Sequence, residues 1–135
     1  MPLPGLHVIA EGATPAGQRW YLRAGGAPED YYTMLETVHP DGRRDEGGMG
    51  GPLLYPGRLV NDYVGMASDG PLRVIVRADR RVRQLVLHTA RGERHILRPA
   101  ADDAGLGITF FAGLLPWTAI DQIQLLDRDG RELVP

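Results

Sequence analysis

The 135-residue chain contains neither cysteine nor lysine, and these two absences remove several kinds of chemistry. Without cysteine the chain has no disulfide, no thiolate metal ligand and no cysteine nucleophile. Without lysine it has no Schiff-base amine and no ammonium group for a phosphate-binding loop. The lack of cysteine favours a reducing compartment, so we expect a cytoplasmic protein. We also expect no metal and no cofactor.

Long apolar runs are missing as well. No stretch approaches the roughly 18 consecutive apolar residues that a membrane-spanning helix needs. The first residues, Met1–His7, carry neither a basic segment nor a long apolar segment, so we expect no signal peptide. The sequence therefore predicts no association with a membrane.

Glycine and proline are abundant, at 18 and 11 residues, and they separate short runs rich in aromatic and β-branched side chains. These runs give ten candidate strands, at residues 6–10, 19–23, 31–38, 59–64, 72–77, 82–89, 93–98, 107–115, 119–126 and 131–134, of which we expect seven to nine to form. No segment shows a helical stripe. Short strands with a turn signal about every 8–12 residues are typical of sandwiches and barrels. We therefore predict a single all-β domain over residues 1–135, an antiparallel Ig-like β-sandwich of seven to nine strands.

Residues 43–58 interrupt this pattern. The run Gly47-Gly48-Met49-Gly50-Gly51-Pro52 would cost much entropy inside a helix or a central strand. We predict a Gly-rich crossover loop here, between two halves of the fold. A loop of this length is either a functional loop or a plain connection.

Charge is strongly segregated along the chain. Residues 73–98 hold eight of the 15 basic residues, all arginine, against Asp79 and Glu93 only, which gives this stretch about +6. The rest of the chain carries about −8, so the net charge of −2 hides a basic segment. A fixed basic surface attracts acidic partners.

Strand alternation gives these arginines a direction. Arg73 and Arg77 share one face of the strand predicted at 72–77, and Arg83 is the second residue of the strand predicted at 82–89. If the two strands form a hairpin, these arginines lie on one face of it. We predict Arg73, Arg77 and Arg83 as partner-binding residues; the alternative is a solvated face paired with acids from other segments. The acidic remainder of the chain, and the absence of a recognition helix or an aromatic RNA-binding motif, argue against nucleic acid.

Other side chains suggest weaker alternatives. His88 and His95 flank a turn, but no metal-ligand spacing accompanies them. Acids and His39 gather at the edge of the 39–58 loop, where paired carboxylates in a cleft can do acid–base work. With Trp20 and Tyr55 as walls, this loop would form the mouth of a small-ligand or carbohydrate site, or of a minor hydrolase. The pairs Tyr31-Tyr32 and Phe110-Phe111 place one ring on each strand face, so we expect one of each at the surface.

Three stretches carry a family resemblance. They are Gly47–Gly57, Val74–Leu87 with its Arg-Ala-Asp-x-Arg-Val run, and Phe110–Gly130 with its Leu-Asp-Arg-Asp-Gly ending. Together they resemble small Ig-like β-sandwich domains of actinobacterial proteins of uncharacterised function, over residues 18–134. The resemblance implies a sandwich fold and a GC-rich bacterial source, and brings no catalytic residues.

The sequence thus favours a non-enzymatic protein-interaction or structural module. The partner is an acidic protein or a second copy of the chain, since the acidic segments 29–46 and 121–132 complement the basic one. Small-ligand binding or hydrolysis through the 39–58 loop is the competing prediction.

Overall fold

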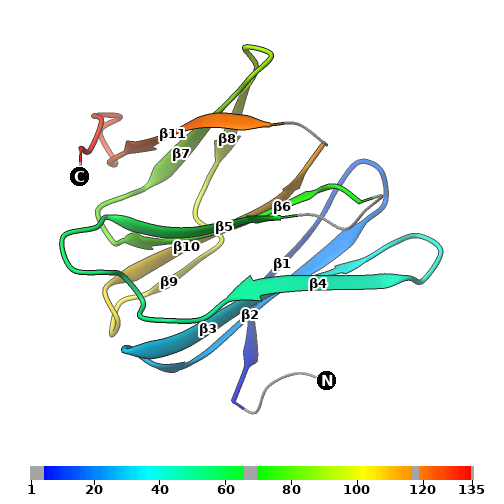
Figure 1. The fold of residues 1–135 in the computed structure, drawn as a ribbon, viewed down its shortest axis with the longest axis horizontal. Coiled ribbons are helices and arrows are strands. Elements are labelled where there is room, and N and C mark those ends of the chain that lie inside the picture. The colour runs from blue at the N-terminus through cyan, green and yellow to red at the C-terminus, as the bar shows by residue number, and fades with distance from the viewer. Residues whose placement is uncertain (1–4, 66–69, 117–118, 135) are drawn as a thin grey trace.

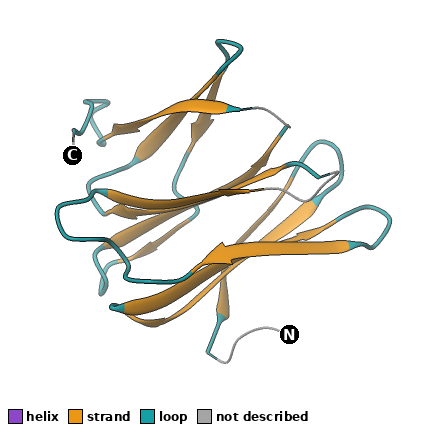
Figure 2. Cartoon of the chain, in the orientation of Figure 1, coloured by secondary structure: helices purple, strands orange, loops and turns teal. Residues whose placement is uncertain are grey.

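The computed structural model describes residues 5–65, 70–116 and 119–134, and every regular element within them is a β-strand (Figures 1 and 2). In chain order the strands are β1 (His7–Ala13), β2 (Arg19–Ala27), β3 (Asp30–Val38), β4 (Arg44–Met49), β5 (Val60–Gly65), β6 (Leu72–Asp79), β7 (Gln84–Thr89), β8 (Arg94–Leu97), β9 (Ala101–Asp103), β10 (Ile108–Leu115) and β11 (Ile120–Leu126). All pairings are antiparallel. A search of these residues finds no helix able to cross a membrane.

The strands form three sheets stacked as three layers (Figure 1). The N-terminal sheet has the order β1-β2-β3-β4, the central sheet β5-β6-β10-β9 and the C-terminal sheet β11-β7-β8. Across the first two layers, β4 contacts β5, β3 contacts β6 and β2 contacts β10. These two sheets therefore lie face to face with their strands in matching order.

The central sheet is covered on both faces. Every residue of β10 is buried, and so is every residue of β6 up to Ala78. One core, between the N-terminal and central sheets, includes Leu22, Leu35, Ile75 and Phe110. The other, between the central and C-terminal sheets, includes Val74, Leu85, Phe111 and Leu125. Each fully buried side chain of this size contributes about 1.5–3 kcal/mol, so both faces of one sheet hold the domain together.

Five hairpin turns have the same hydrogen bond. In each, a glycine with positive φ (Gly17, Gly42, Gly92, Gly107 or Gly130) donates its backbone N–H to the carbonyl three residues earlier. A left-handed backbone is easy for glycine and strained for other residues. At Gly42 and Gly130 an aspartate before the glycine also accepts a backbone N–H, with the Asp41 carboxylate 3.0 Å from the amide of Arg43. The Asp-Gly signals in the sequence thus mark true turns.

The all-β prediction is confirmed, and the strand count is higher than the seven to nine expected. Two strands lie outside the predicted set. β4 occupies the first part of the predicted Gly-rich loop; it is an edge strand, where glycine is better tolerated. Only residues after Met49 form the crossover to β5. β9 is three residues long, and residues 131–134 make one isolated bridge, Leu126 to Glu132, instead of a strand.

Two expectations are wrong because the protein has three layers of sheet. Phe110 and Phe111 are 2% and 0% exposed, although we expected one ring at the surface. The strand that contains Arg77 and the strand that follows Arg83 do not form a hairpin, because β6 pairs with β5 and β10, whereas β7 pairs with β8 and β11. Between them Val82 is buried in the second core, and the chain changes layer there.

Candidate functional site

The structure separates the three arginines predicted from the sequence. Arg73 and Arg77 lie on the face of β6 that the N-terminal sheet covers, and they are 7% and 0% exposed. Arg83 precedes β7 at the layer change, with its side chain 33% exposed. The three residues therefore do not share one exposed face. Their role in partner binding stays a prediction. Of the three side chains, only that of Arg83 is exposed enough to contact a macromolecule.

Arg77 is bound by the protein itself. Its Nη1 donates to the Tyr31 carbonyl and to Thr33 Oγ1, each at 3.1 Å. Its Nη2 donates to the carbonyls of Gly50 and Pro52, at 3.0 and 2.9 Å. The guanidinium carbon lies 5.7 Å from the centre of the Tyr31 ring. Burial lowers the pKa of Arg77 from its ordinary value. The residue ties β3 and the crossover loop to the central sheet.

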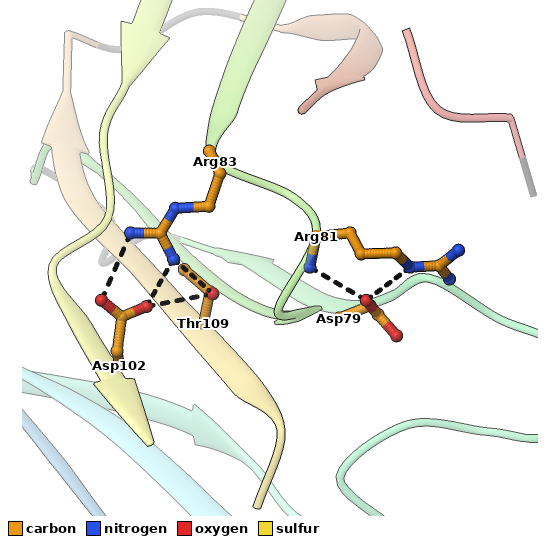
Figure 3. A network of polar contacts seen from close by, with 5 residues as sticks. All are labelled: Asp79, Arg81, Arg83, Asp102 and Thr109. Atoms are coloured by element: carbon orange, nitrogen blue, oxygen red, sulfur yellow. Dashed lines mark hydrogen bonds and ion pairs between the residues drawn. The ribbon is translucent and has the colours of Figure 1, made fainter. Parts of the chain in front are cut away.

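Exposed arginines gather instead at the layer change. Arg83 makes two hydrogen bonds to the Asp102 carboxylate, at 2.7 and 3.3 Å, and one of 3.1 Å to the buried hydroxyl of Thr109 (Figure 3). Thr109 in turn donates to Asp102 at 3.1 Å. The bond from Arg83 lowers the pKa of the Asp102 carboxyl. This network fixes the Arg83 guanidinium beside β9 and β10.

The turn before Arg83 carries two more arginines. Arg81 bonds Asp79 through its backbone amide and its Nε, at 3.0 and 2.9 Å (Figure 3). That side-chain bond lowers the pKa of the Asp79 carboxyl. The Arg83 amide bonds the Leu126 carbonyl at 2.8 Å, which brings the turn after β11 alongside and places Arg128 next to this turn.

Together these segments enclose a cleft of about 360 Å³. We call it the basic cleft; its walls are Arg80, Arg81, Arg83, Asp127, Arg128 and Leu133. Within the described residues Arg80 and Arg128 form no ion pair. The Asp127 carboxylate is already engaged, since it accepts the amides of Asp129 and Arg131 at 2.9 Å. Arg81 and Arg83 are paired with Asp79 and Asp102, so Arg80 and Arg128 outweigh the single charge of Asp127 and the cleft is positive.

A second, larger cleft of about 660 Å³ opens between the β1–β2 turn and one end of the central sheet. We call it the Trp20 cleft, after the aromatic side chain among its described walls. Ala112, Leu114, Pro71 and Pro15 also line it, and Thr14 and Gln18 are the polar side chains among the described lining residues. Thr14 Oγ1 donates to Gln18 Oε1 at 2.8 Å, so these polar groups satisfy each other.

The predicted mouth at residues 39–58 is not assembled as expected. His39 Nε2 lies 2.5 Å from Asp45 Oδ2, while Asp41 turns outward and pairs with Arg43. Tyr55 is 53% exposed and does not line the Trp20 cleft. Trp20, Tyr55 and the loop acids therefore form no common pocket among the residues that the structure places.

The histidine pair is also divided. His95 stands opposite Leu87 in the β7–β8 ladder, and His88 stands opposite Arg94, so the two rings point to opposite faces of the sheet. His88 Nε2 lies 3.2 Å from Gln124 Oε1. Over residues 5–65, 70–116 and 119–134 no three His, Asp or Glu side chains are grouped as metal ligands.

Sequence reasoning missed Arg128 as a neighbour of the basic segment. It lies 45 positions after Arg83, within an Asp-Gly turn that carries no functional signal of its own.

The burial of Arg73 and Arg77, in contrast, could have been inferred from the sequence of a neighbouring strand. The sequence of β10 is apolar except for Thr109, which is typical of a strand covered on both faces, and β10 is the neighbour of β6.

Comparisons with protein-family models, with curated proteins and with solved structures find no significant match to this chain. The resemblance to actinobacterial Ig-like domains therefore stays a prediction. What the chain does must be argued from its own surface.

Proposed function

We propose that this protein is a non-enzymatic interaction module that binds an acidic segment of a partner protein in the basic cleft. One observation carries the proposal: four arginines line a single concave site in which Arg80 and Arg128 have no ion-pair partner among the described residues. A volume of about 360 Å³ lies at the lower end of the range for ligand sites, and would hold one or two carboxylate side chains.

The fixed and the free arginines have different parts in this proposal. Arg81 and Arg83 are held by Asp79 and Asp102, so their guanidinium planes are already oriented. Arg80 and Arg128 are exposed and lose little existing interaction when a carboxylate arrives. A guanidinium presents paired donors that match a carboxylate. Such contacts guide association and orientation, and they weaken as salt is raised.

The test is binding of a fluorescein-labelled peptide of eight glutamates, measured by anisotropy at low and at physiological ionic strength. The double variant Arg80→Glu/Arg128→Glu should weaken binding by about 10- to 100-fold, since each exposed charge contributes on the order of 1 kcal/mol. The melting temperature should stay within about 2 °C of the parent, because neither residue makes an ion pair in the fold.

The matched control is Arg91→Glu/Arg94→Glu, which reverses two exposed arginines of the same basic segment outside the cleft. This control should reduce affinity by no more than about threefold through long-range charge. Equal loss in both double variants would indicate a nonspecific charge effect and refute the assignment of the cleft. So would a parent protein that fails to bind the peptide at low salt.

A second candidate function is binding of a small apolar ligand in the Trp20 cleft, favoured by its volume of about 660 Å³ and its apolar walls. The probe is anilinonaphthalene sulfonate, whose fluorescence rises in apolar sites. Leu114→Gln should abolish most of that rise in the folded protein, and Arg80→Glu should not. A fluorescence increase that is the same in both variants would contradict this candidate.

A further inference from the structure

Arg73 and Arg77 lie on the same face of β6 but differ in their hydrogen bonds. Arg77 donates four hydrogen bonds to protein acceptors. Arg73, four residues earlier and 7% exposed, forms no hydrogen bond or ion pair with any residue that the structure describes. The Nε atom of Arg73 is fully buried without an acceptor. The Nε of Arg77 is buried without an acceptor as well, so the two residues differ in their Nη atoms, which the protein binds in Arg77 and leaves without a partner among the described residues in Arg73.

An arginine cannot escape this situation by losing its proton, because a guanidinium group stays protonated in proteins. Leaving a buried charge without a partner costs several kcal/mol, and an arginine retained in such a place needs a counter-ion. Of the three nitrogens only Nε is both sealed from solvent and unsatisfied, so the two Nη atoms reach an opening in the surface. An anion from solution can contact the two Nη atoms of Arg73 through this opening.

The opening lies where the edges of two sheets come together. Gly47 belongs to β4, the edge of the N-terminal sheet, and Tyr63 belongs to β5, the edge of the central sheet. These edges contact each other and run side by side in Figure 1. From the point where a Cβ of residue 47 would stand, the Tyr63 hydroxyl lies at 2.6 Å and the Arg73 Nε and Nη2 at 3.0 and 3.1 Å. Glycine at 47 therefore lets a hydroxyl and a guanidinium approach the same spot.

Two more polar side chains lie two residues along the same ladder. Gly47 stands opposite Leu35, and Asp45 stands opposite Thr37. Thr37 is 1% exposed, and its Oγ1 has no hydrogen-bond partner within the described structure. The Asp45 carboxylate is directed to His39, 2.5 Å away, and forms no ion pair with Arg73. The acid that shares the Gly47 face of β4 is thus engaged elsewhere.

We propose that Arg73 and the Tyr63 hydroxyl bind a small oxyanion, a carboxylate or phosphate group, at the opening between β4 and β5. The two Nη atoms would donate to two oxygens of the anion, which is the arrangement that guanidinium and oxyanion geometry favours. This site does not depend on the basic cleft, which lies on the other side of the central sheet and uses different arginines.

The test uses two probes at constant ionic strength, inorganic phosphate and acetate, titrated into the ¹⁵N-labelled protein and followed by the Arg73 Nε–H and Gly47 amide signals. The anion that saturates the site at the lower concentration shows whether the site prefers a phosphate or a carboxylate group. Arg73→Met should raise the dissociation constant at least tenfold, and Tyr63→Phe about three- to tenfold. Arg80→Met, in the basic cleft, should leave it unchanged.

Arg73→Met also separates a binding role from a structural one. Replacing an unsatisfied buried charge by an apolar chain of similar length is neutral or stabilising, so this variant should melt at or above the parent temperature without anion. Asp45→Asn should leave anion affinity unchanged or raise it. A destabilised Arg73→Met protein, or anion affinity that is the same in parent and Arg73→Met, would overturn the proposal.

Discussion

The hydrogen bonds of Arg77 allow a sharp prediction for the variant Arg77→Met. Methionine keeps much of the buried volume but removes four donated bonds of 2.9–3.1 Å, which leaves the carbonyls of Tyr31 and Gly50 without this donor. The Pro52 carbonyl keeps a second bond, from Asn61 at 3.2 Å.

The magnitude follows from these acceptors. An unsatisfied buried acceptor costs about 1–3 kcal/mol, and two or three of them are created. Relief from burying the guanidinium offsets part of this, so we expect a loss of about 3–5 kcal/mol. That is a large fraction of the roughly 5–15 kcal/mol by which a domain of this size is stable.

The assay is equilibrium unfolding in urea, followed by tryptophan fluorescence, because Trp20 packs against the core that Arg77 borders. Arg77→Lys should lose less than Arg77→Met, since an ammonium group still reaches some of the acceptors. Arg91→Met, at an exposed turn, is the control and should stay within about 0.5 kcal/mol. A loss below about 1 kcal/mol for Arg77→Met would show that these bonds do not hold the sheets together.

Three further predictions concern other parts of the fold. Phe110→Ala and Phe111→Ala should each lower the free energy of unfolding by about 3–5 kcal/mol in the same urea assay, because both rings are buried. In a two-layer sandwich one of the two rings would be exposed, so a small loss for one variant would contradict the three-layer arrangement. Gly48→Ala should cost more than about 2 kcal/mol, or shift β3–β4 amide signals, because its Cβ would lie 2.4 Å from a β3 carbonyl oxygen. The Asp102 pKa should be below 3.8 in an NMR titration and return toward it in Arg83→Gln. Because the folded pKa is depressed, the stability from this pair is present above about pH 4 and is lost as the pH falls through the folded value; identical titration in both proteins would refute it.

Periodicity predicted much of the local structure. The strand expected at 31–38 is present as β3, and its alternate residues Tyr31, Thr33, Leu35 and Thr37 are all buried on one face. Alternation also placed Arg73 and Arg77 correctly on a common face of their strand. Side-chain period tells which residues share a face, but it does not tell whether another sheet covers that face.

Long-range arrangement was beyond this kind of reasoning. The turn at Arg80 and Arg81 connects two sheets instead of two paired strands, as the pairings of β6 and β7 show. The basic cleft requires residues 80–83 and 127–133 to meet, which depends on the pairing of β7 with β11. Such pairings are set by the packing of whole sheets and leave no mark at single positions.

The order of strands within the three layers has a consequence for how the chain folds. The N-terminal sheet is continuous in sequence, with β1 to β4 each paired to the next. The other two sheets are interleaved: β7 and β8 leave the central sheet after β6, β9 and β10 return to it, and β11 leaves again. The N-terminal sheet requires only short loop closures, whereas the central and C-terminal sheets must assemble together through distant contacts. The chain therefore contains a local half that can form quickly and an interleaved half that sets the folding rate.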